Sequence, residues 1–243
     1  MAARVGLIIP SSNRMVEEEM VRAFPRGVTA HVMRQRMTGV HHMALEQLLT
    51  RIEEATATLL DARCGVVAFH CTATAMEEGS GGEARILAAM AGAPQAITTA
   101  GAIDRALRHL EARRIVLVTP YDAATTAGEA AFLAAAGYVV LSAAGYDLGG
   151  SDQFCAAPPQ FWRDRVMEVA RPNADAYLVS CANISIFPVI DELEARLGCP
   201  VVTSNQAVMW DALRHLDWHG EGGCPGRLSA VPNWRSAAQA SVR

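Results

Sequence analysis

The most constraining feature of this chain is that the same landmarks occur twice in the same order. Cys71 in GVVAFHCTAT and Cys181 in DAYLVSCANI lie 110 residues apart, and so do Pro10 in VGLIIPSSN and Pro120 in IVLVTPYDA. Past each cysteine the offset falls to 106, where APQAITTAGAIDRALRHL matches CPVVTSNQAVMWDALRHL. Landmarks that recur in this way indicate an internal duplication. The chain is therefore predicted to fold as two related halves that present equivalent strand ends to one shared cleft.

Short β-branched runs alternate with helical segments along the chain. We expect strands at residues 4–9, 28–33, 65–69, 95–98, 114–119, 138–142, 174–180 and 200–204. We expect helices at residues 16–23, 42–62, 84–90, 99–110, 125–136, 161–170, 190–197 and 206–216. Several of the strands are apolar without alternation, which is typical of parallel strands that are covered on both faces. The pattern predicts an α/β fold of two pseudo-symmetric halves, each with a central, mostly parallel four-stranded sheet flanked by helices, and a cleft between them.

The duplication also places the expected domain boundaries. The N-terminal half should span residues 1–98 and the C-terminal half residues 113–204. Residues 99–112 and 205–216 should form helices that cross over to the opposite half. Residues 217–243 are rich in Gly, Pro, Ser and Ala without a helical or strand period, so we expect a peripheral or disordered tail.

Composition excludes several classes of partner. The net charge is -4 and Lys and Arg do not cluster, so neither nucleic acid nor an acidic membrane surface is expected as a partner. No apolar run approaches the ~20 residues that a membrane helix needs. The N-terminal MAARVGLII lacks the features of a signal peptide, and six cysteines in 243 residues do not resemble a disulfide framework. We expect a cytoplasmic protein with reduced thiols that forms a homo-oligomer.

Four loops at the predicted strand ends carry the polar groups of the candidate site. Ligands of open parallel sheets bind beyond the carboxyl ends of the strands. Here these ends are residues 10–13, 70–74, 120–122 and 181–185, which are rich in hydroxyl, amide and thiol groups. Backbone N–H groups in such loops can face an anion. Because the chain contains no lysine, a carboxylate would rely on neutral donors.

Cys71 and Cys181 are the residues most strongly predicted to carry chemistry. A cysteine at a strand end is often a small buried hydrophobic residue. Packing alone, however, gives no reason for a thiol at both equivalent loops, so we predict that both are catalytic. Cys64 and Cys199 fit a core role instead, and His70 fits a hydrogen-bonded structural role better than that of a group that lowers a thiol pKa.

No cofactor and no metal are expected. His41 and His42 lack further ligands at helical spacing, and no lysine exists to form a Schiff base. The glycines at 79, 81 and 82 do not open directly from a strand, which argues against a nucleotide loop. The acidic run at residues 17–19 is expected to be a solvated helix face.

Five motifs together resemble the aspartate/glutamate racemase superfamily, and within it the branch of maleate cis–trans isomerase and arylmalonate decarboxylase. They are VGLIIPSSN, FHCTAT, TPY, SCAN and PVVTSNQA, and the resemblance covers residues 4–216. Arylmalonate decarboxylases retain only the second-half thiol, whereas this chain has both Cys71 and Cys181, which favours an isomerase or a racemase. The CTAT loop and Ala182 depart from the isomerase pattern, so the substrate stays open.

The resemblance implies a small carboxylate substrate and a division of labour between the thiols. Cys71 would add to the double bond of a cis-enedioate such as maleate, and Cys181 would supply and retrieve a proton on the neighbouring carbon. The carboxylates would be held by Asn13, Tyr121 and Asn183, with Ser12, Thr72 and Thr74 as further candidates. Three alternatives remain: a two-thiol racemase of an amino acid or related acid, an arylmalonate-type decarboxylase, and a carboxylate-binding protein without catalysis.

Overall fold

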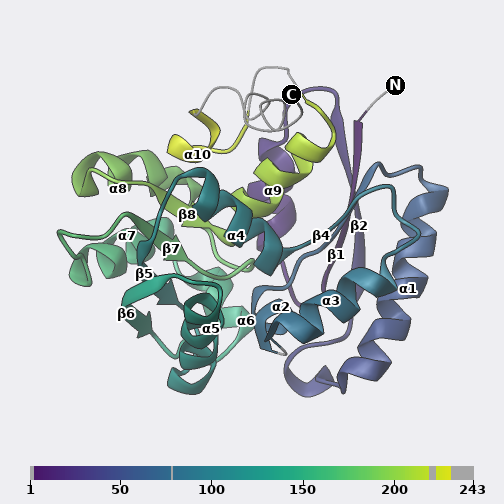
Figure 1. Cartoon of the computed structure of the whole chain (residues 1–243), viewed down its shortest axis with the longest axis horizontal. Coiled ribbons are helices and arrows are strands. Elements are labelled where there is room, and N and C mark those ends of the chain that lie inside the picture. The colour runs from purple at the N-terminus through teal and green to yellow at the C-terminus, as the bar shows by residue number, and fades with distance from the viewer. Residues whose placement is uncertain (1–2, 78, 219–222, 231–243) are drawn as a thin grey trace, which may run out of the picture.

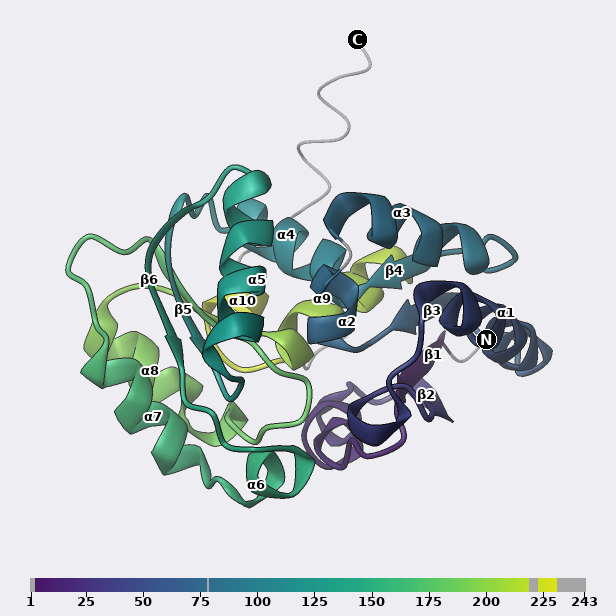
Figure 2. The same ribbon diagram turned by 90° about the horizontal axis from the view of Figure 1, so that it is seen from below.

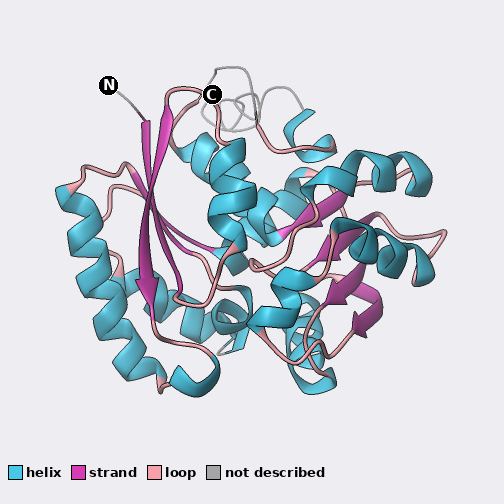
Figure 3. Ribbon diagram, turned by 180° about the vertical axis from the view of Figure 1, so that it is seen from behind, coloured by secondary structure: helices cyan, strands magenta, loops and turns pink. Residues whose placement is uncertain are grey.

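Two parallel sheets, one in each half of the chain, organise the structure (Figure 1, Figure 3). The computed structural model describes residues 3–77, 79–218 and 223–230. The first sheet has the strand order β2-β1-β3-β4, and the second has the equivalent order β6-β5-β7-β8. The strands are β1 (Ala3–Pro10), β2 (Val28–Gln35), β3 (Val66–Phe69), β4 (Ala96–Thr98), β5 (Arg114–Thr119), β6 (Val139–Gly145), β7 (Ala176–Val179) and β8 (Val201–Thr203). The predicted α/β fold with two pseudo-symmetric halves is confirmed.

Helices flank both sheets. The first half contains η1 (Val16–Val21), η2 (Gly39–His41), α1 (Leu45–Asp61), α2 (Thr72–Glu77), α3 (Gly79–Ala89) and α4 (Thr99–His109). The second half contains α5 (Ala123–Ala135), α6 (Ser151–Ala156), α7 (Pro159–Glu168), η3 (Phe187–Val189), α8 (Ile190–Leu197), α9 (Ser204–His215) and α10 (Arg227–Ala230).

The apolar strands form the centre of each half. Every residue of β3 and of β7 is buried, as expected for strands with neighbours on both edges and helices on both faces. The side chains of β3 belong to an apolar cluster that also includes Ala176 and Leu178 of β7, while Tyr177 and Val179 belong to a second cluster. This burial removes apolar surface from water and is the main force that holds each half together.

Strand register gives the duplication a structural definition. Val5 pairs with Val66 in the first sheet, and Ile115 pairs with Ala176 in the second, which reproduces the offset of 110. At the last strand, however, Thr98 and Thr203 are equivalent, because each pairs at the end of its sheet and caps the helix that follows. The offset at this point is therefore 105, and the expected 106 holds only at the helix ends. The reason is that α9 has 12 residues and α4 has 11.

The two helices that follow the last strands lie side by side between the halves (Figure 2). Helix α4 contacts β8 of the second half, and α9 contacts η1, β3 and β4 of the first half. An ion pair joins them, because the half-exposed Arg105 guanidinium donates to both carboxylate oxygens of the fully buried Asp211 at 2.6–3.0 Å.

Several elements differ from the sequence-based expectation. Helices α2 and α6 fall in segments for which no helix was expected. Within the expected tail, residues 223–230 pack against α8 and α9, and both Cys224 and Leu228 are buried. Residues 223–230 are thus ordered against the second half. The rest of the expected tail after residue 218, residues 219–222 and 231–243, lies outside the described part. No helix among the described residues is both long and apolar enough to cross a membrane.

Candidate active site

A cavity of 1090 Å³ lies between the two halves, at the carboxyl ends of the strands. Its lining includes all the residues that the sequence singled out: Ser12, Asn13, Cys71, Thr72, Thr74, Tyr121, Cys181 and Asn183. The structure therefore brings the candidate site together, while the roles of these residues remain predictions. The described residues that line the cavity include no arginine, and the chain has no lysine.

The two thiols occupy equivalent positions. Cys71 follows β3 and directly precedes α2, and Cys181 follows β7. Both are free and buried. Cys71 Sγ lies 3.2 Å from the Thr74 hydroxyl, and the backbone N–H of Asn183 donates to Cys181 Sγ at 3.3 Å. Each sulfur thus has a polar partner supplied by its own loop.

Burial keeps both thiols protonated in the resting protein. It raises the pKa of Cys71, and the hydroxyl and backbone N–H of Thr74 oppose this shift. Burial raises the pKa of Cys181 to about 12, although hydrogen bonds from the Tyr121 hydroxyl and from Asn183 lower it in part. The pKa of Tyr121 is itself raised well above its ordinary value, mainly by burial. Neither sulfur is therefore a preformed thiolate in the resting protein.

The two predicted asparagines also connect the halves. Asn13 donates from Nδ2 to the Ala182 carbonyl at 2.9 Å, while its Oδ1 accepts from the backbone N–H groups of Met15 and Val16. Asn183 Oδ1 accepts from the Arg14 backbone N–H at 2.9 Å. The side-chain oxygens of Asn13 and Asn183 are therefore both occupied. Each side chain can offer an amide N–H group to a carboxylate.

Sequence reasoning missed that the start of α6 belongs to the wall of the site, where Ser151, Asp152, Gln153 and Phe154 line the cavity. Cys155 lies in α6, and its Sγ donates to Asn183 Oδ1 at 3.1 Å. Helix α6 reaches across to the first half (Figure 2), where Asp152 forms an ion pair of 2.7 Å with Arg14. No signal in the sequence placed this segment beside the opposite half.

The remaining candidates carry hydroxyl groups, and they differ in burial and in whether the hydroxyl already has a hydrogen-bond partner. Thr72 is buried and donates to the Ser204 hydroxyl at 2.8 Å. Ser12 is exposed at the rim, where its hydroxyl accepts from Ser151 at 3.0 Å. Thr74 is half-buried beside Cys71. Tyr121 packs edge-on against Phe154, with ring centroids 5.8 Å apart.

A buried polar chain lies behind Cys71 and corrects the expectation for the acidic run. Glu19 is buried, and its Oε2 accepts from the Asn205 amide at 2.9 Å, while Asn205 Oδ1 lies 2.9 Å from His70 Nε2. His70 Nδ1 lies 3.0 Å from the Thr99 hydroxyl. Burial lowers the pKa of His70 to about 4, so this histidine is neutral and structural, as the sequence suggested. Glu19 lies on the buried face of η1 with Val16 and Met20, and a solvated acidic face was the wrong expectation for this residue.

Gly145 supports the Tyr121 loop through close contact. A Cβ at this position would lie 2.3 Å from Thr126 Oγ1 and 2.6 Å from the Tyr121 carbonyl oxygen. We expect Gly145→Ala to lower the free energy of unfolding by ~1–3 kcal/mol, because the backbone around Tyr121 must move. Gly128→Ala is the matched control: nothing lies within 4 Å, and alanine in a helix should add up to ~1 kcal/mol. Urea unfolding of both variants checks this, and equal midpoints would contradict it.

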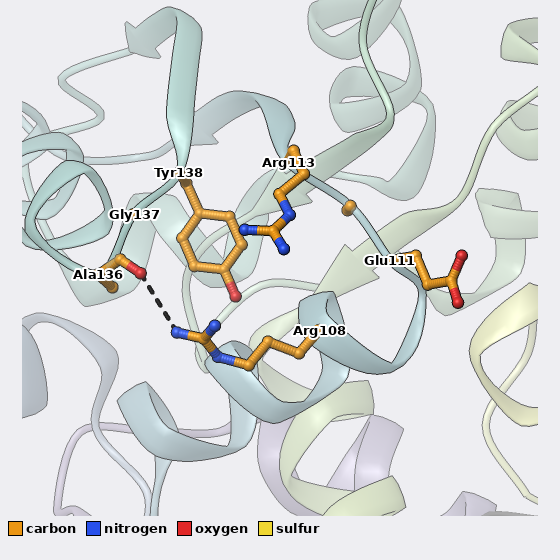
Figure 4. A pocket seen from close by; sticks show the side chains of 7 residues that line it. Arg108, Glu111, Arg113, Ala136, Gly137 and Tyr138 are labelled. Carbon is orange, nitrogen blue, oxygen red and sulfur yellow. Dashed lines mark hydrogen bonds between the residues drawn. The ribbon is translucent and has the colours of Figure 1, made fainter. Parts of the chain in front are cut away.

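A second hollow lies away from the cleft (Figure 4). Its volume is 530 Å³, and it is formed where the end of α4 meets the end of α5. The Arg108 guanidinium at its wall donates to the Ala136 carbonyl at 3.2 Å and pairs with Asp104 at 2.9 Å. The described residues that line this hollow include no thiol, and its Arg108 is already paired with Asp104. The candidate active site is therefore the cleft between the halves.

The fold and the site define a class of protein: two duplicated α/β halves with one thiol on either side of a shared cleft. The chain belongs to the arylmalonate decarboxylase family, whose family model matches residues 5–229. The resemblance inferred from the sequence motifs is thereby confirmed.

Known relatives in this family carry two activities. The chain is 30% identical to the maleate isomerase of Nocardia farcinica, over 88% of this chain and 90% of the relative. It is 27% identical to the arylmalonate decarboxylase of Bordetella bronchiseptica, over 86% and 89% of the two chains. A solved structure of a Nocardia farcinica maleate cis-trans isomerase mutant with a covalently bound succinylcysteine intermediate superposes with a TM-score of 0.85, at 26% identity and over 93% and 97% of the chains.

Proposed function

We propose that this chain is a cofactor-independent isomerase that converts a small cis-enedioate of the maleate type into its trans isomer. The observation that carries the proposal is the pair of buried thiols at equivalent strand ends of one cavity. A decarboxylation that needs a single proton donor leaves one of these thiols without a task. The family relatives that act as maleate isomerases, and the succinylcysteine seen in one of them, support the same choice.

The reaction follows from the positions of the two sulfurs. Cys71 first loses its S–H proton to solvent. The resulting Cys71 thiolate attacks one carbon of the double bond, and the π electrons move onto the neighbouring carbon and its carboxylate. The Cys181 S–H gives its proton to that carbon, which leaves a saturated thioether. Rotation about the new single bond follows. The Cys181 thiolate then removes the proton, the C–S bond breaks, and the trans product and the Cys71 thiolate are released.

Neutral donors must stabilise the negative charge that develops on the carboxylate. We assign the amide N–H groups of Asn13 and Asn183 and the hydroxyl of Tyr121 to this task, with Ser12, Thr72 and Thr74 as further contacts. Preorganised donors in a site that excludes water stabilise such charge strongly. The donors are held in place by the bonds that connect the two halves, so little reorganisation is needed during the reaction.

Incubation with three substrates in deuterated water tests the proposal. Proton NMR should show maleate converted to fumarate without added cofactor. Phenylmalonate should stay intact, and single enantiomers of glutamate and aspartate should keep their α-hydrogen. Decarboxylation of phenylmalonate, or exchange of the α-hydrogen without maleate turnover, would replace the isomerase by the corresponding alternative.

We also infer that the protein acts in the cytoplasm as a homo-oligomer. Reduced thiols are required by the proposed chemistry and fit that compartment. Light scattering coupled to size-exclusion chromatography tests the oligomer, and a mass equal to one chain would contradict it.

A further inference from the structure

Two buried glutamates occupy equivalent positions in the two halves. Glu19 follows β1 and Glu129 follows β5 at the same offset of 110 that relates Cys71 to Cys181. Both are buried, with 8% of Glu19 and 2% of Glu129 exposed. Their surroundings, however, differ.

Glu19 has a complete set of partners. Its Oε1 accepts from the backbone N–H groups of Ile186 at 2.5 Å and Phe187 at 2.8 Å, and its Oε2 accepts from Asn205. This carboxylate links η1 to the second half and to α9. Its role is structural, because both of its carboxylate oxygens accept hydrogen bonds from other parts of the protein.

The equivalents of these partners are missing around Glu129. The register of the last strands makes Ala100 the counterpart of Asn205, and a methyl group donates no hydrogen bond. The counterparts of Ile186 and Phe187 are Met76 and Glu77, which lie in α2, where backbone N–H groups bond within the helix.

Ser180, the counterpart of His70, is the described residue whose side chain favours the ionised form of Glu129. Its hydroxyl lowers the pKa of Glu129, but the Ser180 hydroxyl and the Glu129 carboxylate do not form a hydrogen bond of normal geometry. Within the described residues, neither oxygen of Glu129 has a hydrogen-bond partner. A buried carboxylate in this condition is costly, whereas the protonated acid is tolerated.

Glu129 lines the cavity together with both thiols and Tyr121. Ionised Glu129 raises the pKa of Cys71, Cys181 and Tyr121 through like-charge repulsion. Glu77 of α2 adds to this repulsion at Cys71, and no titratable residue lies on β6, which packs on the same helix. Burial raises the pKa of Glu129 itself to about 8.

We propose that Glu129 is a positioning residue that acts through its charge: the enzyme works while Glu129 is protonated, and loss of that proton opposes thiolate formation and binding of the anionic substrate. The inference rests on the proposed function in so far as the substrate is an anion that reacts with a thiolate. The inference goes beyond the proposed isomerase function, because it gives a role in the reaction to Glu129, which neither forms a bond to the substrate nor transfers a proton to it.

The pH dependence of Glu129→Gln tests this role, because glutamine keeps the shape and stays neutral at every pH. As pH rises from 7 to 9, the wild-type kcat/KM for maleate should fall relative to that of the variant by about tenfold, as expected for one ionisation near pH 8. A ratio that does not change with pH would overturn the proposal. A variant whose loss of activity is largest above pH 8 would also overturn it, because Glu129 would then act as a base.

Two further variants make the test independent of folding. Glu19→Gln weakens the structural counterpart and should keep the wild-type shape of the pH profile. Glu129→Leu is apolar and of similar size, and it should reproduce the profile of Glu129→Gln. If kcat/KM of Glu129→Gln or of Glu129→Leu fell with rising pH as it does in the wild type, the fall would have another cause and the proposal would fail.

A chemical readout separates this proposal from the proposed function. The rate at which iodoacetamide alkylates Cys71, followed by peptide mass spectrometry across pH, reports thiolate formation without any turnover. Glu129→Gln should shift this titration to lower pH, even if maleate proves not to be the substrate. An unshifted titration would overturn the role of Glu129, whereas absent maleate turnover with a shifted titration would count against the isomerase alone.

Discussion

Cys71→Ala should abolish the conversion of maleate to fumarate, with a fall in rate of at least ~10⁴-fold, because removal of a nucleophile eliminates the covalent route. Neighbouring groups cannot replace the Cys71 sulfur as nucleophile. Thr72 and Thr74 carry alcohols, which are much weaker nucleophiles, and Cys181 belongs to the opposite half. Cys71→Ser should be nearly as inactive, because a serine hydroxyl is barely ionised near neutral pH. Proton NMR of the maleate and fumarate signals measures both variants.

Cys199→Ser is a suitable control for the loss of a thiol as such. Cys199 precedes β8 and does not line the cavity, so this variant should retain wild-type turnover. A Cys71→Ala variant that isomerises maleate at the wild-type rate would remove the isomerase from consideration.

Cys181→Ala should also stop turnover, but it should fail at a different step. Without the Cys181 proton, the carbanionic adduct can revert or be protonated slowly by water, so a thioether on Cys71 should accumulate. A general acid–base group typically contributes ~10²–10⁴-fold, so Cys181→Ser should keep a small residual rate. Mass spectrometry of the variant mixed with maleate should find the added mass on the peptide that carries Cys71.

The location of the adduct decides the division of labour between the thiols. An adduct on Cys181 with Cys71 unmodified, observed in the wild-type protein or in a Cys71 variant, would reverse the two roles. Burial raises the pKa of both Cys71 and Cys181, so the location of the adduct, and not the resting protonation state, distinguishes the two roles.

Local sequence patterns were sufficient to predict the strands and most of the helices. A run such as Val66–Phe69 is apolar at every position because it is covered on both faces, and this requirement is visible in the sequence. Helix α2 was missed because it begins directly after Cys71 with two threonines, which have low helix propensity. Its packing against α3, α4 and α5 compensates for that propensity, and such packing is not a local property.

The thiol pair and the four loops were also predictable, because the duplication repeats them and parallel strands end at one edge of a sheet. The wall of the cleft was not. Residues 149–154, around the start of α6, and residues 38–42, around η2, line the cavity, and no pattern in the sequence placed either segment beside the strand ends. Glu129 did leave a signal, since it falls with Thr126 and Leu133 on the buried face of an alanine-rich helix.

The sequence by itself determined that this chain forms two related halves, which strands lie at their centres, and that one thiol stands at the same strand end of each. These features follow from local burial and from repetition, both of which are written along the chain. Only the tertiary structure decided that Glu19 is satisfied while Glu129 is not. The physical reason is that the partners of a buried charge come from the opposite half, where the last strands have the same register but Ala100 occupies the position of Asn205.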